Sequence, residues 1–396
     1  MSSNKKDLNE KFISFLDQVK DEPHKSVTHL NDRVLVIDGL NTFIRAFAVN
    51  PAINEDGLHI GGMMGFLKSI RYTSDILKPS RVIIVFDGKD GSKRRRKIYP
   101  EYKGTRKVKQ RLNRNVDWGT APLDEQQSMK QQMGRLIEYL EQLPLTLISI
   151  DGIEADDTIA YISQQLLPKS DIFIMSTDKD FLQLVDDRVK VWSPTKKKLY
   201  TKNEVFEEYG IPSRNMLTYR VLDGDKSDNI GGIRGAGIKS IVKYIQPITE
   251  DKDFTIMDLF DYAEKTSDKK IKLLDSIQNS RNLLKRNYLL MQLQKVDIPN
   301  HTKMKIQGAI NGEVPQLIKY RFQTMFLKDK LSTAIPTVIA AIVIVIKSRG
   351  ILAIPMIPSI VMQATILGIM AINANFHDLN KILNIINIPI ITIPRE

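Results

Sequence analysis

Short runs of β-branched and aliphatic residues, separated by helical stretches, constrain the fold of this chain more than any other feature. Strands are predicted at residues 33–38 (RVLVID), 81–87 (RVIIVFD), 145–150 (LTLISI), 171–176 (DIFIMS) and 189–192 (VKVW). Helical patterns lie between them, at residues 61–77, 123–142 and 154–166. Strands that alternate with helices favour a mostly parallel sheet with helices on both faces. The predicted fold class is therefore α/β.

Acidic residues stand at the carboxyl ends of four of these strands. Asp38, Asp87, Glu154 and Asp178 each come at or just after a strand end. In an open α/β sheet this edge is where ligands bind. The sequence therefore predicts a site at this edge.

Further acids extend the set to nine: Asp38, Asp87, Glu154, Asp156, Asp157, Asp178, Asp180, Asp225 and Asp228. So many negative charges cannot assemble without compensation. Lysines would neutralise part of the charge without organising a site, whereas two divalent cations roughly 4 Å apart would neutralise it and bind a phosphodiester between them. The chain has no cysteine and no zinc-like histidine cluster, so oxygen ligands and Mg²⁺ or Mn²⁺ are expected.

Helix capping is the competing explanation for some of these acids. A single aspartate after a strand is most often a helix N-cap, which would account for Asp38 or Asp87 taken alone. Capping explains one of Glu154, Asp156 and Asp157, but not all three.

Positive charge is concentrated in one segment of a chain whose formal charge is +12. Residues 89–114 hold twelve Lys or Arg and two acids. A solvated helix face usually mixes signs, so this segment indicates either a nucleic-acid contact or a solvated basic loop.

A glycine-rich stretch at residues 224–245 interrupts two short helical patterns. Gly232, Gly235 and Gly237 would let backbone N–H groups approach phosphates, with Lys239 close behind. The alternative is a tight helix–helix turn. A dinucleotide fingerprint is disfavoured, because the stretch follows no strand.

Five motifs together resemble the flap endonuclease / 5′-3′ exonuclease family, in order and spacing. They are VLVID, VIIVFDG, EADD, STDKDFLQL and GDKSDNIGGIRGAGIKS, and the likeness covers about residues 32–335. The segment VWSPTKKKLY (191–200) further resembles the ribonuclease H of T-even bacteriophages, a member of that family.

The resemblance implies a PIN-like 5′-nuclease fold with a helix–three-turn–helix lobe, and it implies metal ligands. One metal would be held by Asp38, Asp87, Glu154 and Asp156, the other by Asp178, Asp180 and Asp228, with Asp157 and Asp225 acting through water or behind the ligands. The glycine stretch would grip duplex DNA, in some members with K⁺. In the basic arch, Tyr102 would stack on a base, Lys103 and Arg106 would act at the scissile phosphate, and Arg95 would be a further nucleic-acid contact.

Four segments are expected. They are a loosely attached leader helix (1–31), the catalytic domain with its arch at 89–114 (32–202), a helical DNA-binding lobe (203–333) and an apolar tail (334–396). We expect the tail to be a translated frameshift or appended low-complexity sequence, with a packing extension and a membrane hairpin as alternatives. The absence of cysteine and of a secretory signal fits the cytoplasm, that of a host cell if a phage encodes the protein.

The predicted function is a metal-dependent structure-specific 5′ nuclease that removes RNA primers and 5′ flaps in DNA replication. It would use two Mg²⁺ and have ribonuclease H activity. Its partners would be DNA and RNA–DNA duplexes with a nick or flap, with a single-stranded-DNA-binding protein or sliding clamp in addition, and no membrane; a monomer is expected. The main alternative is a non-catalytic duplex or flap DNA-binding protein whose acids are caps. A toxin-like or exoribonuclease relative would share the acid-edged sheet but lack the glycine stretch.

Overall fold

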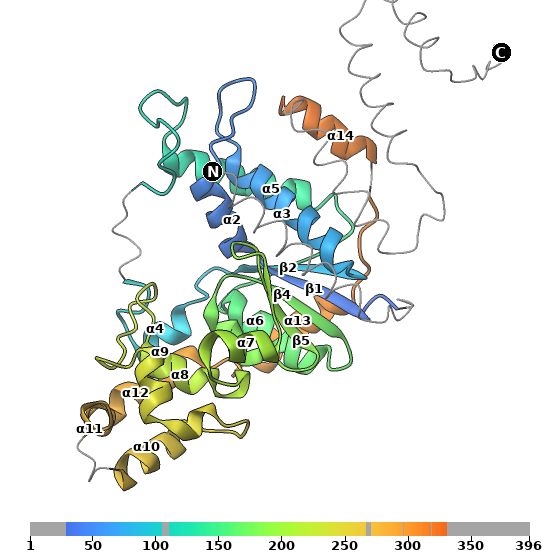
Figure 1. The fold of residues 1–396 in the computed structure, drawn as a ribbon. Coiled ribbons are helices and arrows are strands. Elements are labelled where there is room, and N and C mark those ends of the chain that lie inside the picture. The colour runs from blue at the N-terminus through green and yellow to red at the C-terminus, as the bar shows by residue number, and fades with distance from the viewer. Residues whose placement is uncertain (1–28, 105–110, 267–270, 296, 318, 331–396) are drawn as a thin grey trace, which may run out of the picture.

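A six-stranded sheet forms the centre of the molecule (Figure 1). The computed structural model describes residues 29–104, 111–266, 271–295, 297–317 and 319–330. The strands are β1 (Arg33–Asp38), β2 (Arg81–Asp87), β3 (Thr146–Ile150), β4 (Asp171–Met175), β5 (Val189–Ser193) and β6 (Lys198–Tyr200). They are ordered β3-β2-β1-β4-β5-β6, and β1 to β5 are parallel.

The five predicted strands are confirmed, two of them with unchanged bounds, and so is the predicted α/β class. The sixth strand, β6, was missed. It pairs antiparallel with β5 at the sheet edge and is only three residues long. Three residues are too few for an alternating pattern to stand out from the lysines of the hairpin that precedes them.

One face of the sheet is covered by α2 (Gly39–Val49), α3 (Gly61–Leu77), α5 (Glu125–Leu140) and α14 (Lys319–Lys328). The odd-numbered side chains of β1, such as Leu35 and Ile37, point into this layer and are fully buried. Period-2 alternation sends Val34 and Val36 to the opposite face, where they are equally buried. Burial on both faces explains why the strand sequence is apolar throughout.

The opposite face is covered mainly by α6 (Ala155–Tyr161), the π-helix 162–166, α7 (Lys202–Tyr209), α8 (Met216–Asp223) and α13 (Asn300–Asn311). The helix predicted at 154–166 thus forms, but its second half is wound as a π-helix. The Arg188 guanidinium donates to the backbone carbonyls of Ser163, Leu167 and Ser170, which stabilises the end of this segment.

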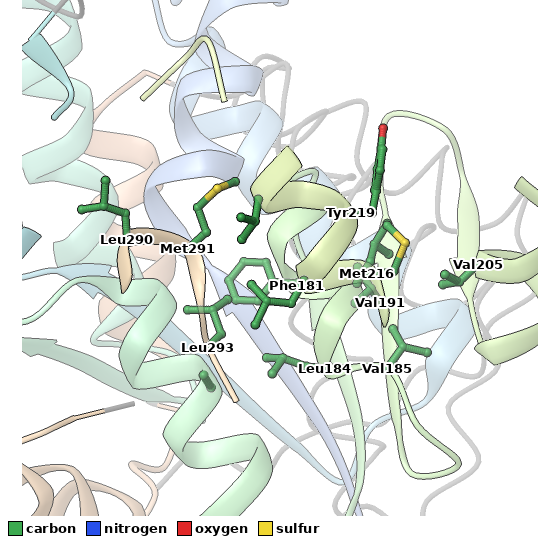
Figure 2. Packing of buried hydrophobic residues seen from close by; sticks show 14 of the residues in the cluster. Phe181, Leu184, Val185, Val191, Val205, Met216, Tyr219, Leu290, Met291 and Leu293 are labelled. Atoms are coloured by element: carbon green, nitrogen blue, oxygen red, sulfur yellow. The ribbon is translucent and has the colours of Figure 1, made fainter. Parts of the chain in front are cut away.

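The remaining helices gather beyond the sheet edge that carries the acids (Figure 1). They are α4 (Lys93–Ile98), α9 (Ile238–Tyr244), α10 (Ile256–Lys265), α11 (Lys272–Asn279) and α12 (Arg281–Met291). Figure 2 shows how they join the sheet layer: Phe181, Met216 and Met291 lie in one apolar cluster. The same continuous core therefore supports the acids and the helical lobe.

The lobe is smaller than the sequence suggested. Residues 203–333 were assigned to it as a unit, but α13 and α14 return to the sheet. Ile310 of α13 accepts a 2.7 Å hydrogen bond from Arg81 at the start of β2, and Phe322 of α14 packs edge-on against Tyr139 of α5. Apolar helical periodicity gives the face a helix buries, but not which partner it meets.

No helix in the described ranges is both long and apolar enough to cross a membrane. The leader helix predicted at 1–31 falls outside them except for its last three residues. The apolar tail lies outside them entirely.

Candidate metal and nucleic-acid site

The sheet order reverses between β1 and β4, and acids stand at that point. β1 is paired with β2 on one side and β4 on the other, so the chain leaves these strands in opposite directions. Asp38 ends β1, and Asp178 follows β4 by three residues. Such switch points hold the ligands of open α/β proteins.

Asp38 both caps a helix and carries one of the carboxylates of the acidic site. One carboxylate oxygen accepts a 3.1 Å hydrogen bond from the Asn41 amide and so caps α2. The other accepts a 3.0 Å bond from the Ser176 hydroxyl. Burial, together with the charges of Asp178 and Asp87, nevertheless raises the pKa of Asp38 to about 7. Capping is therefore real but leaves the charge uncompensated.

The carboxylates of Asp156 and Asp178 also have a raised pKa. Burial and the neighbouring charges of Asp178 and Asp38 raise the pKa of Asp156 well above its usual range. Burial and the charge of Asp180 raise the pKa of Asp178 to about 7. Asp38 is buried, whereas Asp156 and Asp178 are half-buried. These three acids, here called the central trio, therefore repel one another at the edge of the sheet.

A second group lies beside the central trio. Asp178, Asp180 and Asp225 each have a carboxylate oxygen within 4.8 Å of the others, which is close enough to hold one ion. Asp178 belongs to both groups and also caps the 3₁₀-helix Lys179–Leu184 by accepting a bond from the Asp180 amide. We call Asp178, Asp180 and Asp225 the outer trio.

Asp87 and Glu154 hold the start of α6 in place. Asp87 accepts a 2.7 Å hydrogen bond from the Ala155 amide, which is the first N–H of the helix. Glu154 is 2% exposed and forms ion pairs with Arg95 and Lys103. Burial alone would raise the pKa of Glu154, but these two cations outweigh it and lower the pKa.

Asp157 faces arginines and lies one helical turn from Glu154. Arg95 donates to both of its carboxylate oxygens at 2.8 Å, and Arg94 approaches at 3.3 Å. From the sequence, divalent cations were expected to neutralise Glu154, Asp156 and Asp157 together. In the structure two of the three are neutralised by side chains, and only Asp156 is left among carboxylates.

Two predicted nucleic-acid contacts need correction. Arg95 is 3% exposed, and besides its acidic partners it donates to the Leu290 carbonyl of α12, so it is a buried structural cation. The Tyr102 ring is also 3% exposed and offers no stacking face in this conformation. Its hydroxyl donates to Asp228 at 3.0 Å and approaches Glu154 at 3.4 Å.

Lys103 lies at the site but its partner Arg106 falls outside the described residues. The Lys103 ammonium binds Glu154, and the Lys103 amide donates to the Asp228 carbonyl at 2.9 Å; the backbone of Lys103 is left-handed, with φ at 57°. The base of the basic segment is therefore attached to the Glu154 carboxylate and to the Asp228 backbone, which lie in two different parts of the chain.

The glycine stretch is a compact turn next to the acids. Gly224, with φ at 73°, and Gly232 approach each other so closely that a Cβ on Gly232 would lie 2.1 Å from the Asp223 carbonyl oxygen. Gly235 and Gly237 are exposed with open space where a Cβ would stand, and Lys239 is exposed in the first turn of α9. Tight packing thus explains Gly232, while the other three positions face solvent.

Helix α12 joins this turn to the base of the basic segment. The buried Asn287 amide donates to the Gly231 carbonyl at 2.8 Å, and the Arg286 guanidinium stacks 4.1 Å over the Tyr99 ring. Arg95 of α4 binds the carbonyl of Leu290 on the same helix.

Sequence reasoning missed Arg220, which lies at the centre of the outer trio. It donates to Asp180 at 2.7 Å and to Asp225 at 2.8 Å. A signal was present: in YRVLDGD, one arginine stands among apolar residues on a helix that ends in acids. Arginine at such a position is rarely buried unless it is paired.

The donor set fits a divalent cation. It consists of carboxylate oxygens, with no thiolate or imidazole, and hard cations such as Mg²⁺ prefer oxygen. Burial and neighbouring negative charge raise the pKa of Asp38 and Asp178, and a bound cation would offset both effects.

Comparison with known proteins places the chain in a family. Residues 33–210 match the family described as the 5′-3′ exonuclease N-terminal, resolvase-like domain. The 5′-3′ exonuclease of Aquifex aeolicus is 32% identical over 213 residues, which cover 53% of this chain and 68% of the relative. The 5′-3′ exonuclease of Bacillus subtilis is 30% identical, covering 54% of this chain and 70% of the relative. The flap endonuclease Xni of Shewanella loihica is 29% identical and is covered to 95% of its length.

A solved structure has the same fold. It is the T5 D15 protein co-crystallised with metal ions, which is 22% identical, with a TM-score of 0.52 and coverage of 76% of this chain and 99% of that chain. From its sequence relatives, this chain belongs to the 5′-3′ exonuclease family.

Proposed function

We propose that this protein is a divalent-metal-dependent 5′ nuclease that hydrolyses phosphodiester bonds at 5′ ends and flaps of DNA. The observation that carries the proposal is the cluster of carboxylates at the switch point of the sheet: Asp178, Asp180 and Asp225 each bring a carboxylate oxygen within 4.8 Å of the others, and burial with neighbouring negative charge raises the pKa of Asp38, Asp156 and Asp178. Carboxylates that repel one another in this way add nothing to stability, so their position points to a cationic ligand. Membership of the 5′-3′ exonuclease family agrees with this reading.

The proposed mechanism uses two cations, preferably Mg²⁺. The central trio would hold one and the outer trio the other, sharing Asp178; ligand roles for Asp87, Glu154 and Asp228 remain predictions. Divalent cations bound there would supply charge neutralisation for the phosphodiester and a water of lowered pKa.

The chain's own residues would orient the substrate. Lys103 has its ammonium on Glu154, beside the acids, and would meet a phosphate oxygen entering the site. The solvent-facing Gly235, Gly237 and Lys239 would contact the duplex backbone. Arg106 keeps its predicted role at the scissile phosphate.

Cleavage of a 5′-labelled flap, with Mg²⁺ or with chelator, tests the proposal. Asp178→Asn should abolish Mg²⁺-dependent cleavage and leave flap binding measurable. Asp171→Asn is the matched control, because Asp171 is exposed at the opposite end of the same strand, β4, and its loss should leave the rate unchanged. Wild-type protein that binds the flap but never cuts it would favour the non-catalytic DNA-binding alternative.

Finer features belong to the same proposal. Nicked, flapped and RNA-primed duplexes compared side by side would establish ribonuclease H activity and primer removal, and with them the likeness to T-even phage ribonuclease H. Mn²⁺ should replace Mg²⁺, and a K⁺ dependence of duplex binding would support an ion at the glycine turn. We propose a cytoplasmic monomer that works in replication beside a single-stranded-DNA-binding protein or a sliding clamp.

A further inference from the structure

Arg220 of α8 lies inside the acidic site rather than beside it. The residue is 4% exposed, and its guanidinium uses all three nitrogens. Nε donates to Asp180 at 2.7 Å, one terminal nitrogen donates to Asp225 at 2.8 Å, and the other donates to Asp223 and the Gly224 carbonyl at 3.1 Å. A planar guanidinium can bridge separate carboxylates in this way, which a lysine ammonium cannot reproduce.

These contacts divide the site into two unlike halves. In the outer trio, Asp180 and Asp225 bind Arg220, so three negative charges face one fixed positive charge. In the central trio, Asp38 receives its hydrogen bonds from an amide and a hydroxyl. A cation that enters the outer trio must therefore share Asp180 and Asp225 with Arg220, whereas the hydrogen bonds described for Asp38 in the central trio come from uncharged groups.

We propose that Arg220 is a built-in counter-ion that holds the outer trio together in the metal-free protein and weakens divalent-cation binding there. The two halves of the site consequently bind cations with unequal strength, the central trio tightly and the outer trio weakly. This inference rests on the proposed metal-dependent function. Arg220 acts through Asp180 and Asp225 and is a positioning residue, not a catalytic one.

Removing Arg220 should lower the stability of the metal-free protein but raise its affinity for a divalent cation. Ordinary structural damage would not produce these opposite changes. Without the guanidinium, three carboxylates lie together with no fixed cation, so the metal-free protein loses stability. A divalent cation then meets three negative charges and no competing positive charge, so its affinity for the outer trio rises, by about tenfold or more even with solvent screening. A residue that only supported the fold would lower stability with and without metal alike.

Mn²⁺ titration by calorimetry and thermal unfolding with and without Mn²⁺ test the proposal on the full chain. Wild-type protein should show a tight and a weak class of Mn²⁺ sites, and Asp225→Asn should remove the weak class. Arg220→Met should melt lower than wild type without Mn²⁺, regain much of the difference with saturating Mn²⁺, and bind the weak-class ion about tenfold more tightly.

Controls separate this result from other causes. Arg188→Met removes a guanidinium whose described hydrogen bonds all go to backbone carbonyls, so it should lower the melting temperature without changing Mn²⁺ affinity. If Arg220→Met does not fold, the double variant Arg220→Met/Asp223→Asn, which also removes the charge of an acid outside the trio that would lose its ion pair with Arg220, carries the same expectation of tighter binding. Arg220→Lys, which keeps the charge but not the bridging geometry, should have a Mn²⁺ affinity between those of wild type and Arg220→Met.

Unchanged or weaker Mn²⁺ binding after loss of the guanidinium would overturn the counter-ion role. Equal losses of melting temperature with and without Mn²⁺ would overturn it as well. If wild-type protein bound no Mn²⁺ at all, the proposed metal-dependent function itself would fail, and that outcome differs from a wild-type protein that binds Mn²⁺ but does not respond to Arg220→Met.

Discussion

Replacing Arg95 with methionine should destabilise the protein rather than weaken its contact with DNA. The side chain is 4% exposed and makes hydrogen bonds to Glu154, to both oxygens of Asp157 and to the Leu290 carbonyl. Removing one partner of a buried ion pair costs about 3–5 kcal/mol, because the remaining charge stays desolvated. Lys103 still binds Glu154, which places the expected loss toward the lower end of that range.

The neighbouring arginine gives a matched control. Arg94 approaches the same carboxylate, that of Asp157, at 3.3 Å, but its side chain is 34% exposed. An ion pair in that position contributes about 1 kcal/mol or less. At roughly 2 °C per kcal/mol for a protein of this size, Arg95→Met should lower the melting temperature by about 6–10 °C, and Arg94→Met by about 2 °C or less.

Urea unfolding at neutral pH with chelator would measure both variants, and fluorescence anisotropy with flap DNA would follow binding by the folded protein. Arg95→Met should bind DNA within about twofold of wild type while folded. The reasoning would be refuted if the two variants unfolded alike, or if Arg95→Met kept its stability but lost DNA affinity tenfold.

Two other predictions concern pH and packing. With metal chelated, Asp38 and Asp178 bind protons more tightly in the folded state (pKa about 7) than in the unfolded state (pKa about 4). The free energy of unfolding should therefore fall as pH rises from about 4 to 7 and then level off. Saturating Mg²⁺ should remove this fall, and a flat profile with chelator would contradict the assigned burial and repulsion of the two carboxylates. Gly232→Ala should cost roughly 2 kcal/mol or more, because its Cβ would meet the Asp223 carbonyl at 2.1 Å, whereas Gly231→Ala has open space and should cost less than about 1 kcal/mol in the same urea titration.

The sequence was informative wherever a local pattern determines structure. The strands ending at Asp38 and Asp87 were predicted with the observed bounds, because apolar runs buried on both faces have a clear signature. The parallel order then implied that acids at different strand ends meet at one edge, and Asp38 and Asp178 do so.

Pairing between distant segments was beyond the sequence argument. Positive charge at Arg95 and aromatic character at Tyr102 suggested an exposed surface, since a basic run is usually solvated. Both side chains are buried because distant acids supply their partners: Asp157 lies 62 residues beyond Arg95, and Asp228 lies 126 residues beyond Tyr102. Local composition reveals that a charge exists, but only the tertiary fold reveals which opposite charge it meets.

Helix α12 has a consequence for any substrate. It carries Asn287, bonded to the glycine turn, and the Leu290 carbonyl, bonded to the foot of the basic segment, only one turn apart on a single rigid rod. A duplex gripped at the turn would thus be held at a set distance from the carboxylates, whatever its length or sequence. Helix α12 would thereby fix the distance between the glycine turn and the cleaved bond. The number of nucleotides between those two points would then be set by the protein.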